Sequence, residues 1–216
     1  MSTPPSRPTS TILATVEKYY AEQLARFGPT PRGVDWNSAE SQALRFDRLL
    51  VALEEDADGA DTTLVDYGCG YGALLGVLRA RRHRIQYHGY DISAAMIDAA
   101  RNGHAGDDRA AFTTDLSAVA RAQYTLASGI FNVRLGHGAE EWYGYVVETL
   151  AAMDALSTRA FAFNMLSTYS DEARRRSDLF YMDPLSMFDL CKRRFSPRVA
   201  LLHDYPLYEF TIIVRK

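Results

Sequence analysis

One short run, Leu64–Gly72, holds the residues best suited to bind a cofactor. It reads LVDYGCGYG, so a strand-like segment passes directly into three glycines at alternate positions, and a helical pattern follows. Glycine adopts positive φ readily and lets the backbone come close to a ligand, while the first turn of a helix presents unpaired N–H groups. The run predicts a cofactor-binding loop; a tight strand-to-helix turn is the plainer alternative.

An acid, Asp91, follows the next strand-like run, 23 residues after Gly68. A carboxylate in this place accepts hydrogen bonds from the hydroxyls of an adenosine ribose. Its alternative role is to cap the next helix, for which Ser93 is equally suited. Both NAD and S-adenosylmethionine (SAM) are bound through a glycine turn and a ribose acid. These two features therefore predict an adenosine cofactor and leave both cofactors open.

The spacing of the glycines distinguishes the two cofactors. A dinucleotide site usually has G-x-G-x-x-G, where the helix N-terminus meets a pyrophosphate. Here the third glycine, Gly72, comes one residue early, and Ala73 follows it. An acid, one residue and then G-x-G-x-G resembles the first motif of the class I SAM-dependent methyltransferases. The resemblance covers about residues 62–216 and includes the reversed C-terminal strand typical of that fold.

The resemblance implies cofactor contacts at the ends of the first four expected strands. Asp66 and the glycine turn are expected along the methionine half of SAM, with Asp91 at the ribose and Ile92 on the adenine. Asp115 and Leu116 match the position that meets the adenine amine, although Asp115 also suits a loop N-cap. The predicted cofactor contacts in this part of the chain are Asp66, Gly68, Cys69, Gly70, Gly72, Asp91, Ile92, Asp115, Leu116 and Phe131.

The fourth expected strand, which in this family ends facing the transferred methyl group, leads into ASGIFNV over Ala127–Val133. No Asn-Pro-Pro-Tyr follows, and in this the chain differs from family members that methylate amines of DNA bases or of protein glutamine. The formal net charge is -3, from 24 Lys and Arg against 27 Asp and Glu, which argues against a broad basic face for nucleic acid. Both observations favour a small-molecule acceptor.

The N-terminal region offers further candidate contacts. Arg45 is a candidate for the carboxylate of the cofactor, because a guanidinium donates two parallel hydrogen bonds to such a group; an exposed helical arginine is the alternative. Tyr19, Tyr20 and Trp36 are candidates to box the acceptor or a sulfonium, since aromatic faces attract cations. At helical spacing, however, such residues more often pack in a core.

His137 is the candidate general base, because it lies between two glycines just after the fourth strand. A histidine there is placed to deprotonate a nucleophile; a solvated loop histidine with no partner is the alternative. Asn132 and Tyr169 are further candidate acceptor contacts. No spacing among the histidines and cysteines is typical of a metal site, so we expect no metal.

Alternation of strand-like and helical runs predicts an α/β fold with a Rossmann-like, doubly wound, mainly parallel sheet. The last two strands are joined too closely for a parallel crossover, so the C-terminal strand must be reversed. We expect a disordered tail over 1–10, an N-terminal helical cap over 11–60 with a capping box at Asn37 and Glu40, and the SAM-binding domain over 61–216. The expected strands are Thr63–Tyr67, Gln86–Tyr90, Ala111–Thr114, Thr125–Phe131, Arg159–Asn164, Val199–His203 and Glu209–Arg215, and the main helices are Ala73–Arg81, Ala94–Arg101 and Glu140–Ala155.

Composition limits the class of protein. The 216 residues suit one domain with a substantial core. Two cysteines, Cys69 and Cys191, are too few for a disulfide framework, so we expect a reduced, cytoplasmic protein. No apolar run is long enough to span a bilayer. The expected partner is a small-molecule substrate, with no nucleic acid and no membrane, and a monomer or a homodimer remains open.

The sequence thus predicts a methyltransferase that uses SAM and leaves S-adenosylhomocysteine (SAH). The methyl group is expected to go to an oxygen, nitrogen, sulfur or carbon nucleophile of a small metabolite. Two alternatives stand beside this prediction. One is an NAD(P)-dependent oxidoreductase on a related sheet, and the other is a non-catalytic SAM-binding protein that keeps the fold.

Overall fold

The computed structural model describes residues 8–53 and 61–216. Of the expected tail, residues 1–7 lie outside the described residues. The expectation of a disordered tail is wrong for residues 8–10, because they form the start of helix α1 (Pro8–Phe27). A proline suits the first turn of a helix, where its missing N–H has no intrahelical partner to lose.

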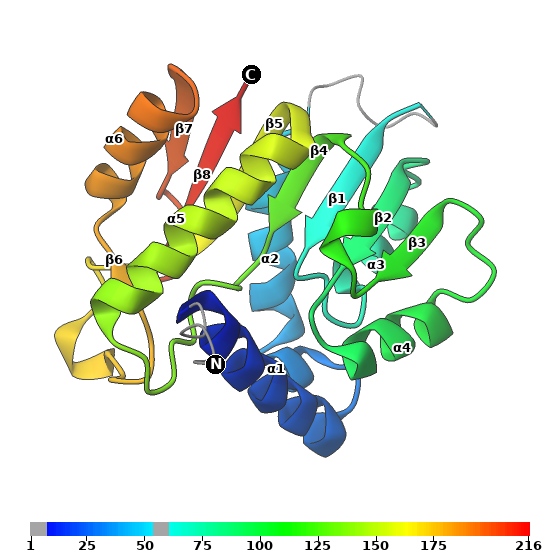
Figure 1. Cartoon of the computed structure of the whole chain (residues 1–216), viewed down its shortest axis with the longest axis horizontal. Coiled ribbons are helices and arrows are strands. Elements are labelled where there is room, and N and C mark those ends of the chain that lie inside the picture. Colours follow the sequence, from blue (N-terminus) through cyan, green and yellow to red (C-terminus); the bar gives the residue numbers. More distant parts are fainter. Residues whose placement is uncertain (1–7, 54–60) are drawn as a thin grey trace, which may run out of the picture.

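Short strands and helices alternate along the rest of the chain (Figure 1). The strands are β1 (Thr63–Tyr67), β2 (Gln86–Tyr90), β3 (Ala110–Thr113), β4 (Ala122–Ala127), β5 (Ser157–Ser167), β6 (Tyr181–Met182), β7 (Arg198–Leu202) and β8 (Glu209–Arg215). The helices after α1 are η1 (Pro31–Val34), α2 (Ala39–Leu50), α3 (Ala73–Ala80), α4 (Ala94–Gly103), η2 (Leu116–Ala118), α5 (Ala139–Leu156), η3 (Glu172–Arg174) and α6 (Pro184–Arg194).

The described strands form one sheet in the order β3-β2-β1-β4-β5-β8-β7, and the short β6 pairs with β5. Strand β8 runs antiparallel to both β5 and β7. The other strand pairs are parallel. The Rossmann-like fold with a reversed C-terminal strand is therefore confirmed. The order of the strands in the sheet changes direction between β1 and β4. The carboxyl ends of these two strands therefore flank the crevice where open α/β sheets bind ligands.

Most element boundaries differ from the expected ones by a few residues, and the differences at β4 and α2 affect the site. Strand β4 begins and ends earlier than expected, at Ala122 and Ala127, and it ends early because the chain turns at Gly129 with φ of 75°. The residues that follow Ala127 therefore form a loop at the crevice. Helix α2 is capped by Ser38, whose Oγ accepts from the Ser41 N–H at 3.2 Å. The expected capping box of Asn37 and Glu40 is therefore wrong, because the cap lies one residue later and Ser41 stands where the box needs a Glu or Gln.

Helices cover the sheet in two layers with separate cores. One core joins α2 and α3 to the sheet through residues such as Phe46 and Leu75. The other joins α1, α5 and α6 to the opposite face through Val16, Trp142 and Met187. The two N-terminal helices thus do different things: α2 packs on the sheet, whereas α1 lies beside α4 and α5 (Figure 1).

The connection from β3 to β4 leaves part of the sheet thinly covered. A right-handed crossover from the edge strand β3 back to β4 must pass over the same face as α5. The connections from β1 to β2, from β2 to β3 and from β4 to β5 contain α3, α4 and α5, but this one contains only η2, with three residues (Figure 1). Space therefore remains beside α5, over the carboxyl ends of β1 and β2.

No helix among the described residues is long and apolar enough to cross a membrane.

Candidate functional site

The glycine turn after β1 has the conformation that its sequence predicts. Gly68 and Gly70 both have positive φ, at 79° and 54°. A Cβ on Gly68 would lie 2.3 Å from Cγ2 of Ile130, so only glycine fits there. The N–H groups of Gly68 and Cys69 donate to the carbonyl of Tyr90 at 2.7 and 2.9 Å, which ties the turn to the end of β2. The turn is thereby held beside the residue that precedes Asp91.

Asp91 lies at the end of β2 with its carboxylate fixed by the backbone. Oδ2 accepts from the Gly70 N–H and Oδ1 accepts from the Ser93 N–H, both at 2.9 Å. The cap of α4 comes from Ser93, whose Oγ accepts from the Met96 N–H. Each carboxylate oxygen keeps a free lone pair for a further donor. Asp91 is thus oriented as an acceptor, and burial raises the pKa of its carboxyl.

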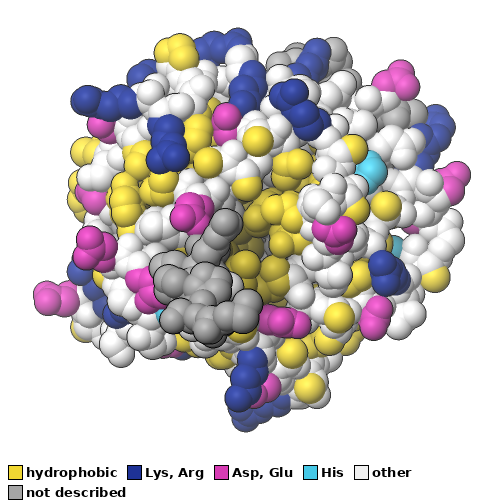
Figure 2. Space-filling view, viewed as in Figure 1, with side chains coloured by type: hydrophobic (Ala, Val, Ile, Leu, Met, Phe, Trp, Pro, Cys, Tyr) yellow, Lys and Arg dark blue, Asp and Glu magenta, His cyan; other side chains and the backbone are white. Residues whose placement is uncertain are grey.

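The main cavity, with a volume of about 740 Å³ including its open mouth, lies in front of this acid. Figure 2 shows an apolar hollow on this face of the molecule. Glu17 and Asp91 are the charged residues of its lining. The lining residues are Leu13, Val16, Glu17, Tyr20, Val34, Trp36, Tyr67, Gly68, Gly70, Tyr90, Asp91, Ile92, Ser93, Met96, Ser128, Gly129, Ile130 and Tyr145. Among the predicted cofactor contacts, Gly68, Gly70, Asp91 and Ile92 therefore come together here.

A second cavity of about 320 Å³ adjoins the first. Asp66 and Cys69 line it, and both cavities share Val34, Trp36, Gly68, Gly70 and Ser128. The Asp66 side chain is buried and accepts from the hydroxyl of Tyr87. Burial raises the pKa of Asp66 to about 7. The hydroxyl oxygen of Ser128 is also buried and has no hydrogen-bond partner in the described structure, which leaves it available to a ligand.

The two adjoining cavities present different polar groups to a ligand. Asp91 offers a carboxylate acceptor in the main cavity, and Asp66 offers a buried acid in the second. Ser128, with its unpartnered hydroxyl, lies where the cavities meet. Within the described part of the chain, no three His, Cys, Asp or Glu side chains form a group that could hold a metal ion.

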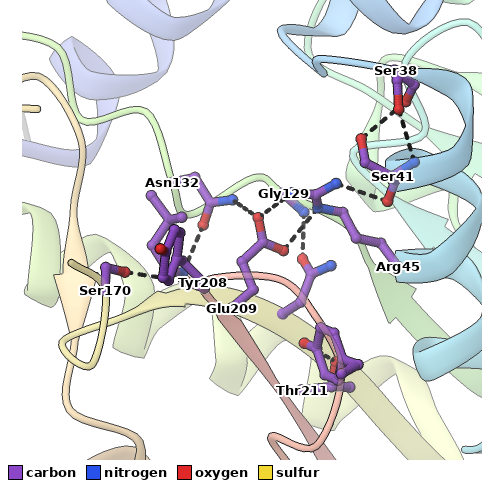
Figure 3. Close-up of polar contacts among 12 residues, drawn as sticks. Ser38, Ser41, Arg45, Gly129, Asn132, Ser170, Tyr208, Glu209 and Thr211 are labelled. Atoms are coloured by element: carbon purple, nitrogen blue, oxygen red, sulfur yellow. Dashed lines mark hydrogen bonds and ion pairs between the residues drawn. The ribbon is translucent and has the colours of Figure 1, made fainter. Parts of the chain in front are cut away.

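Arg45 is not at either cavity, contrary to the sequence prediction. Its guanidinium makes a buried two-point ion pair with Glu209 of β8, at 2.8 and 2.7 Å, and a third bond to the carbonyl of Ser41 (Figure 3). It also lies 3.9 Å from the ring centre of Trp36. Because these contacts occupy the guanidinium, Arg45 supports the cavity wall at Trp36 and does not meet a cofactor carboxylate.

Asn132 belongs to the same buried cluster. Its Nδ2 donates to Glu209 at 3.4 Å and its Oδ1 accepts from the Leu166 N–H at 3.1 Å (Figure 3). These bonds connect the loop after β4 with β5 and β8. Asn132 lines neither cavity, so its expected contact with the acceptor gives way to a structural role.

Four other predicted cofactor contacts lie away from both cavities. Phe131 is fully buried in the core under α5, and its neighbours Gly129 and Ile130 line the main cavity instead. Asp115 is exposed and caps η2 by accepting from the Ser117 N–H at 2.9 Å, and Leu116 is the first residue of η2. Gly72 caps the start of α3, and its carbonyl accepts a hydrogen bond from Nε2 of His104 at 2.9 Å.

The candidate base His137 is also outside both cavities. Its Nδ1 lies 3.3 Å from a carboxylate oxygen of Glu141, and its ring stacks near Trp142. Tyr169 is 65% exposed and contacts the ring of His203. The structure therefore brings neither residue to the place where a cofactor and an acceptor would meet.

Of the aromatic candidates, Tyr20 lines the main cavity and Trp36 lines both. Tyr19 does not; its ring packs edge-on against Tyr20, and burial with the nearby Asp35 raises its pKa to about 12. Two neighbours hold the Trp36 indole in place. The guanidinium of Arg45 lies 3.9 Å from its ring centre, and Gly129 lies so close that a Cβ there would be 2.3 Å from the indole. Only a glycine at position 129 lets the indole approach this closely.

Several lining residues were missed from the sequence. Tyr67 and Tyr90 are the last residues of β1 and β2. Ligand contacts are expected at the carboxyl ends of strands in this type of sheet, so the position of these two tyrosines in the sequence could have identified them as lining residues. Glu17 and Tyr145 lie within helices, and no local pattern distinguishes them from other helical residues.

Comparison with known proteins gives one consistent result. A family model described as a methyltransferase domain matches residues 65–156. A Mycobacterium tuberculosis protein, Rv1506c, named as a methyltransferase, is 51% identical over 151 residues, which is 70% of this chain and 91% of that protein. Magnesium protoporphyrin IX methyltransferase from Synechocystis with bound SAM is similar in structure, with a TM-score of 0.64, 13% identity and full coverage of both chains. The 1,6-didemethyltoxoflavin-N1-methyltransferase of Burkholderia thailandensis gives a TM-score of 0.65 and 16% identity over 100% of this chain and 93% of that one.

Proposed function

This chain belongs to the class I SAM-dependent methyltransferases, and we propose that it methylates an oxygen, nitrogen, sulfur or carbon nucleophile of a small-molecule metabolite. When bound, SAM supplies a methyl group activated by a positively charged sulfur, and SAH remains after transfer. The nicotinamide-dependent alternative is set aside, because the family, the early third glycine and the solved relatives agree on SAM.

The observation that carries the assignment of the site is the fixed carboxylate of Asp91. It lies in the wall of the main cavity with both oxygens oriented by backbone N–H groups. An acceptor that is already oriented loses little conformational freedom when it binds ribose hydroxyls. The glycine turn that orients it also joins the main cavity to the second one at Asp66.

The proposal of a small acceptor rests on the shape and charge of the site. The main cavity is a concave, largely apolar space of a size that suits small ligands. The net charge of -3 does not favour a nucleic-acid substrate. Solved proteins of similar fold are named for methylating a magnesium protoporphyrin and a didemethyltoxoflavin, which supports a small acceptor here as well.

The protein contributes to the reaction mainly by alignment. Tyr20 and Trp36 enclose the space in front of the glycine turn, so that they limit the positions of an acceptor and displace water. Orientation of two reactants supplies up to about 7–11 kcal/mol towards a reaction of this type. His137 has no place in this proposal, since it lies outside the cavities.

Binding and turnover measurements test the proposal separately. Calorimetric titration with SAM, SAH and NAD should give binding of the first two only. Incubation with SAM and a cell extract separated into small-molecule, protein and nucleic-acid fractions should release SAH with the small-molecule fraction, and mass spectrometry should detect a product heavier by one methylene. SAH release with only the protein or the nucleic-acid fraction would contradict a small acceptor.

A further inference from the structure

The walls of the main cavity contain a group of tyrosines in addition to the residues assigned to the cofactor. Tyr67 and Tyr90 come from the ends of β1 and β2, Tyr145 from α5 and Tyr20 from α1. We refer to these four residues as the tyrosine cage. The rings of Tyr67 and Tyr90 have centres 4.9 Å apart and an interplanar angle of 65°. The cage occupies the space that the short η2 connection leaves beside α5.

The rings of Tyr67 and Tyr90 pack edge to face, which holds both side chains in place at the strand ends where they line the main cavity. Tyr20 and Tyr145 line the same cavity from α1 and α5. Proteins use such groups of aromatic side chains to bind ammonium groups that carry methyl or methylene substituents.

The charges around the cage have one sign. Glu17 and Asp91 are the charged residues among those that line the main cavity, and both are acids. Burial raises the pKa of Tyr20, Tyr67 and Tyr145, so these phenols stay neutral and present ring faces rather than phenolate charges. The ring faces carry partial negative charge, which adds to the attraction that the two acids exert on a cation.

We propose that the tyrosine cage binds a positively charged organic group of the methyl acceptor, with Glu17 at its rim adding attraction for that charge. This inference rests on the proposed function, because it assigns the acceptor of the same site. It defines the acceptor class as organic cations, such as alkylammonium compounds, and it excludes acceptors whose caged group is a carboxylate or a phosphate. An anion there would be desolvated next to two acids without a compensating partner in the lining.

Three probes of equal shape and different charge test this inference. Choline carries a trimethylammonium group, 3,3-dimethylbutanol carries a neutral tert-butyl group in its place, and 3,3-dimethylbutyrate carries the tert-butyl group with a carboxylate. Each is titrated into the SAH-saturated protein and followed by NMR line broadening. Choline should bind about 10-fold more tightly than the alcohol, which corresponds to a cation–aromatic contribution in the usual range, and the carboxylate should bind most weakly.

Substitutions distinguish how much the ring face, the hydroxyl and the acidic charge each contribute to the binding of choline. Tyr67→Phe should keep the preference for choline over the alcohol, because the ring face remains, whereas Tyr67→Leu should abolish it. Glu17→Gln should weaken choline and leave the neutral alcohol unchanged. Tyr208→Leu is the matched control, since Tyr208 is 39% exposed and lines neither cavity. Thermal unfolding of each variant confirms that it is folded.

The outcomes distinguish this inference from the function on which it rests. If SAH itself does not bind, the assignment of the cofactor site fails and the acceptor class falls with it. If SAH binds but choline and the alcohol bind equally, or neither binds, the cage does not select a cation and the inference is overturned. If choline binds only without SAH and competes with it, the cage belongs to the cofactor, which also overturns the inference.

Discussion

Asp91 holds its carboxylate at the wall of the main cavity through the N–H groups of Gly70 and Ser93. We expect Asp91→Ala to weaken SAM binding by about 1–3 kcal/mol, because it removes a charged acceptor from the ribose hydroxyls. Calorimetry measures the change. Asp98→Ala is the control, since Asp98 is an exposed acid on α4 with a long contact to Arg101. Equal affinities in both variants would show that Asp91 does not bind the ribose.

Asp66 gives the folded protein a pH dependence of definite sign. Burial raises its pKa to about 7 in the folded protein, whereas an unfolded aspartate titrates near about 3.9. Between these values the folded state binds a proton that the unfolded state has released. The free energy of unfolding should therefore fall as pH rises from about 4 to about 7.

Urea unfolding of the wild type and of Asp66→Asn checks this expectation. The wild type should lose more stability than the variant between about pH 5 and about pH 7.5, because the amide does not titrate. The comparison cancels the other titrating groups, which both proteins share. Equal losses in the two proteins would mean that Asp66 is already ionised in the folded state at pH 5.

At the level of elements, the loop after β4 is shaped by one close contact. Gly129 has φ of 75°, and a Cβ there would lie 2.3 Å from the Trp36 indole. We expect Gly129→Ala to destabilise the fold and to shift the fluorescence of Trp36, because the indole must move and alanine is strained at this φ. SAM affinity should fall as well, since Trp36 lines both cavities.

The same substitution elsewhere should have the opposite sign. Gly144 lies in the middle of α5, and a Cβ there meets nothing within 4 Å. Gly144→Ala should therefore raise stability by about 0.5–1 kcal/mol, because alanine loses less conformational entropy in a helix. Thermal unfolding of the two variants in parallel is the measurement. A loss of stability in both would show that the local geometry of position 129 is not the cause.

At the level of the whole molecule, the buried pair of Arg45 and Glu209 joins α2 to β8, the last strand of the chain (Figure 3). The side chains are only 9% and 2% exposed. We expect Glu209→Gln to lower the free energy of unfolding by about 3–5 kcal/mol, because it leaves the guanidinium buried without its counter-charge. Urea unfolding gives the value.

Two comparisons sharpen this prediction. Asp107→Asn, in the partly exposed pair with Arg79, should cost about 1 kcal/mol or less. The double variant Arg45→Met with Glu209→Met should recover much of the loss, because it removes both charges together. If the double variant is no more stable than Glu209→Gln, the lost free energy of unfolding comes from packing and not from the unpaired charge.

The same pair explains why one sequence prediction failed. Arg45 was expected at the cofactor because a guanidinium donates two parallel hydrogen bonds to a carboxylate, yet the carboxylate it meets is that of Glu209, from the opposite end of the chain. No pattern near either residue shows that they meet. His137 and Phe131 failed for a related reason, since the direction of a loop side chain depends on the core beneath it.

The sequence by itself determined the features that depend on local chemistry. The glycine turn, the position of Asp91, the bounds of β1 and β2 and the reversal of β8 all follow from residue type, spacing and connection length. Tertiary structure alone decided which side chains meet across elements. The tyrosine cage joins two strands and two helices, and the pair of Arg45 and Glu209 joins α2 to β8. Such contacts depend on how faces pack, and a face becomes a cavity wall only when its neighbours are in place.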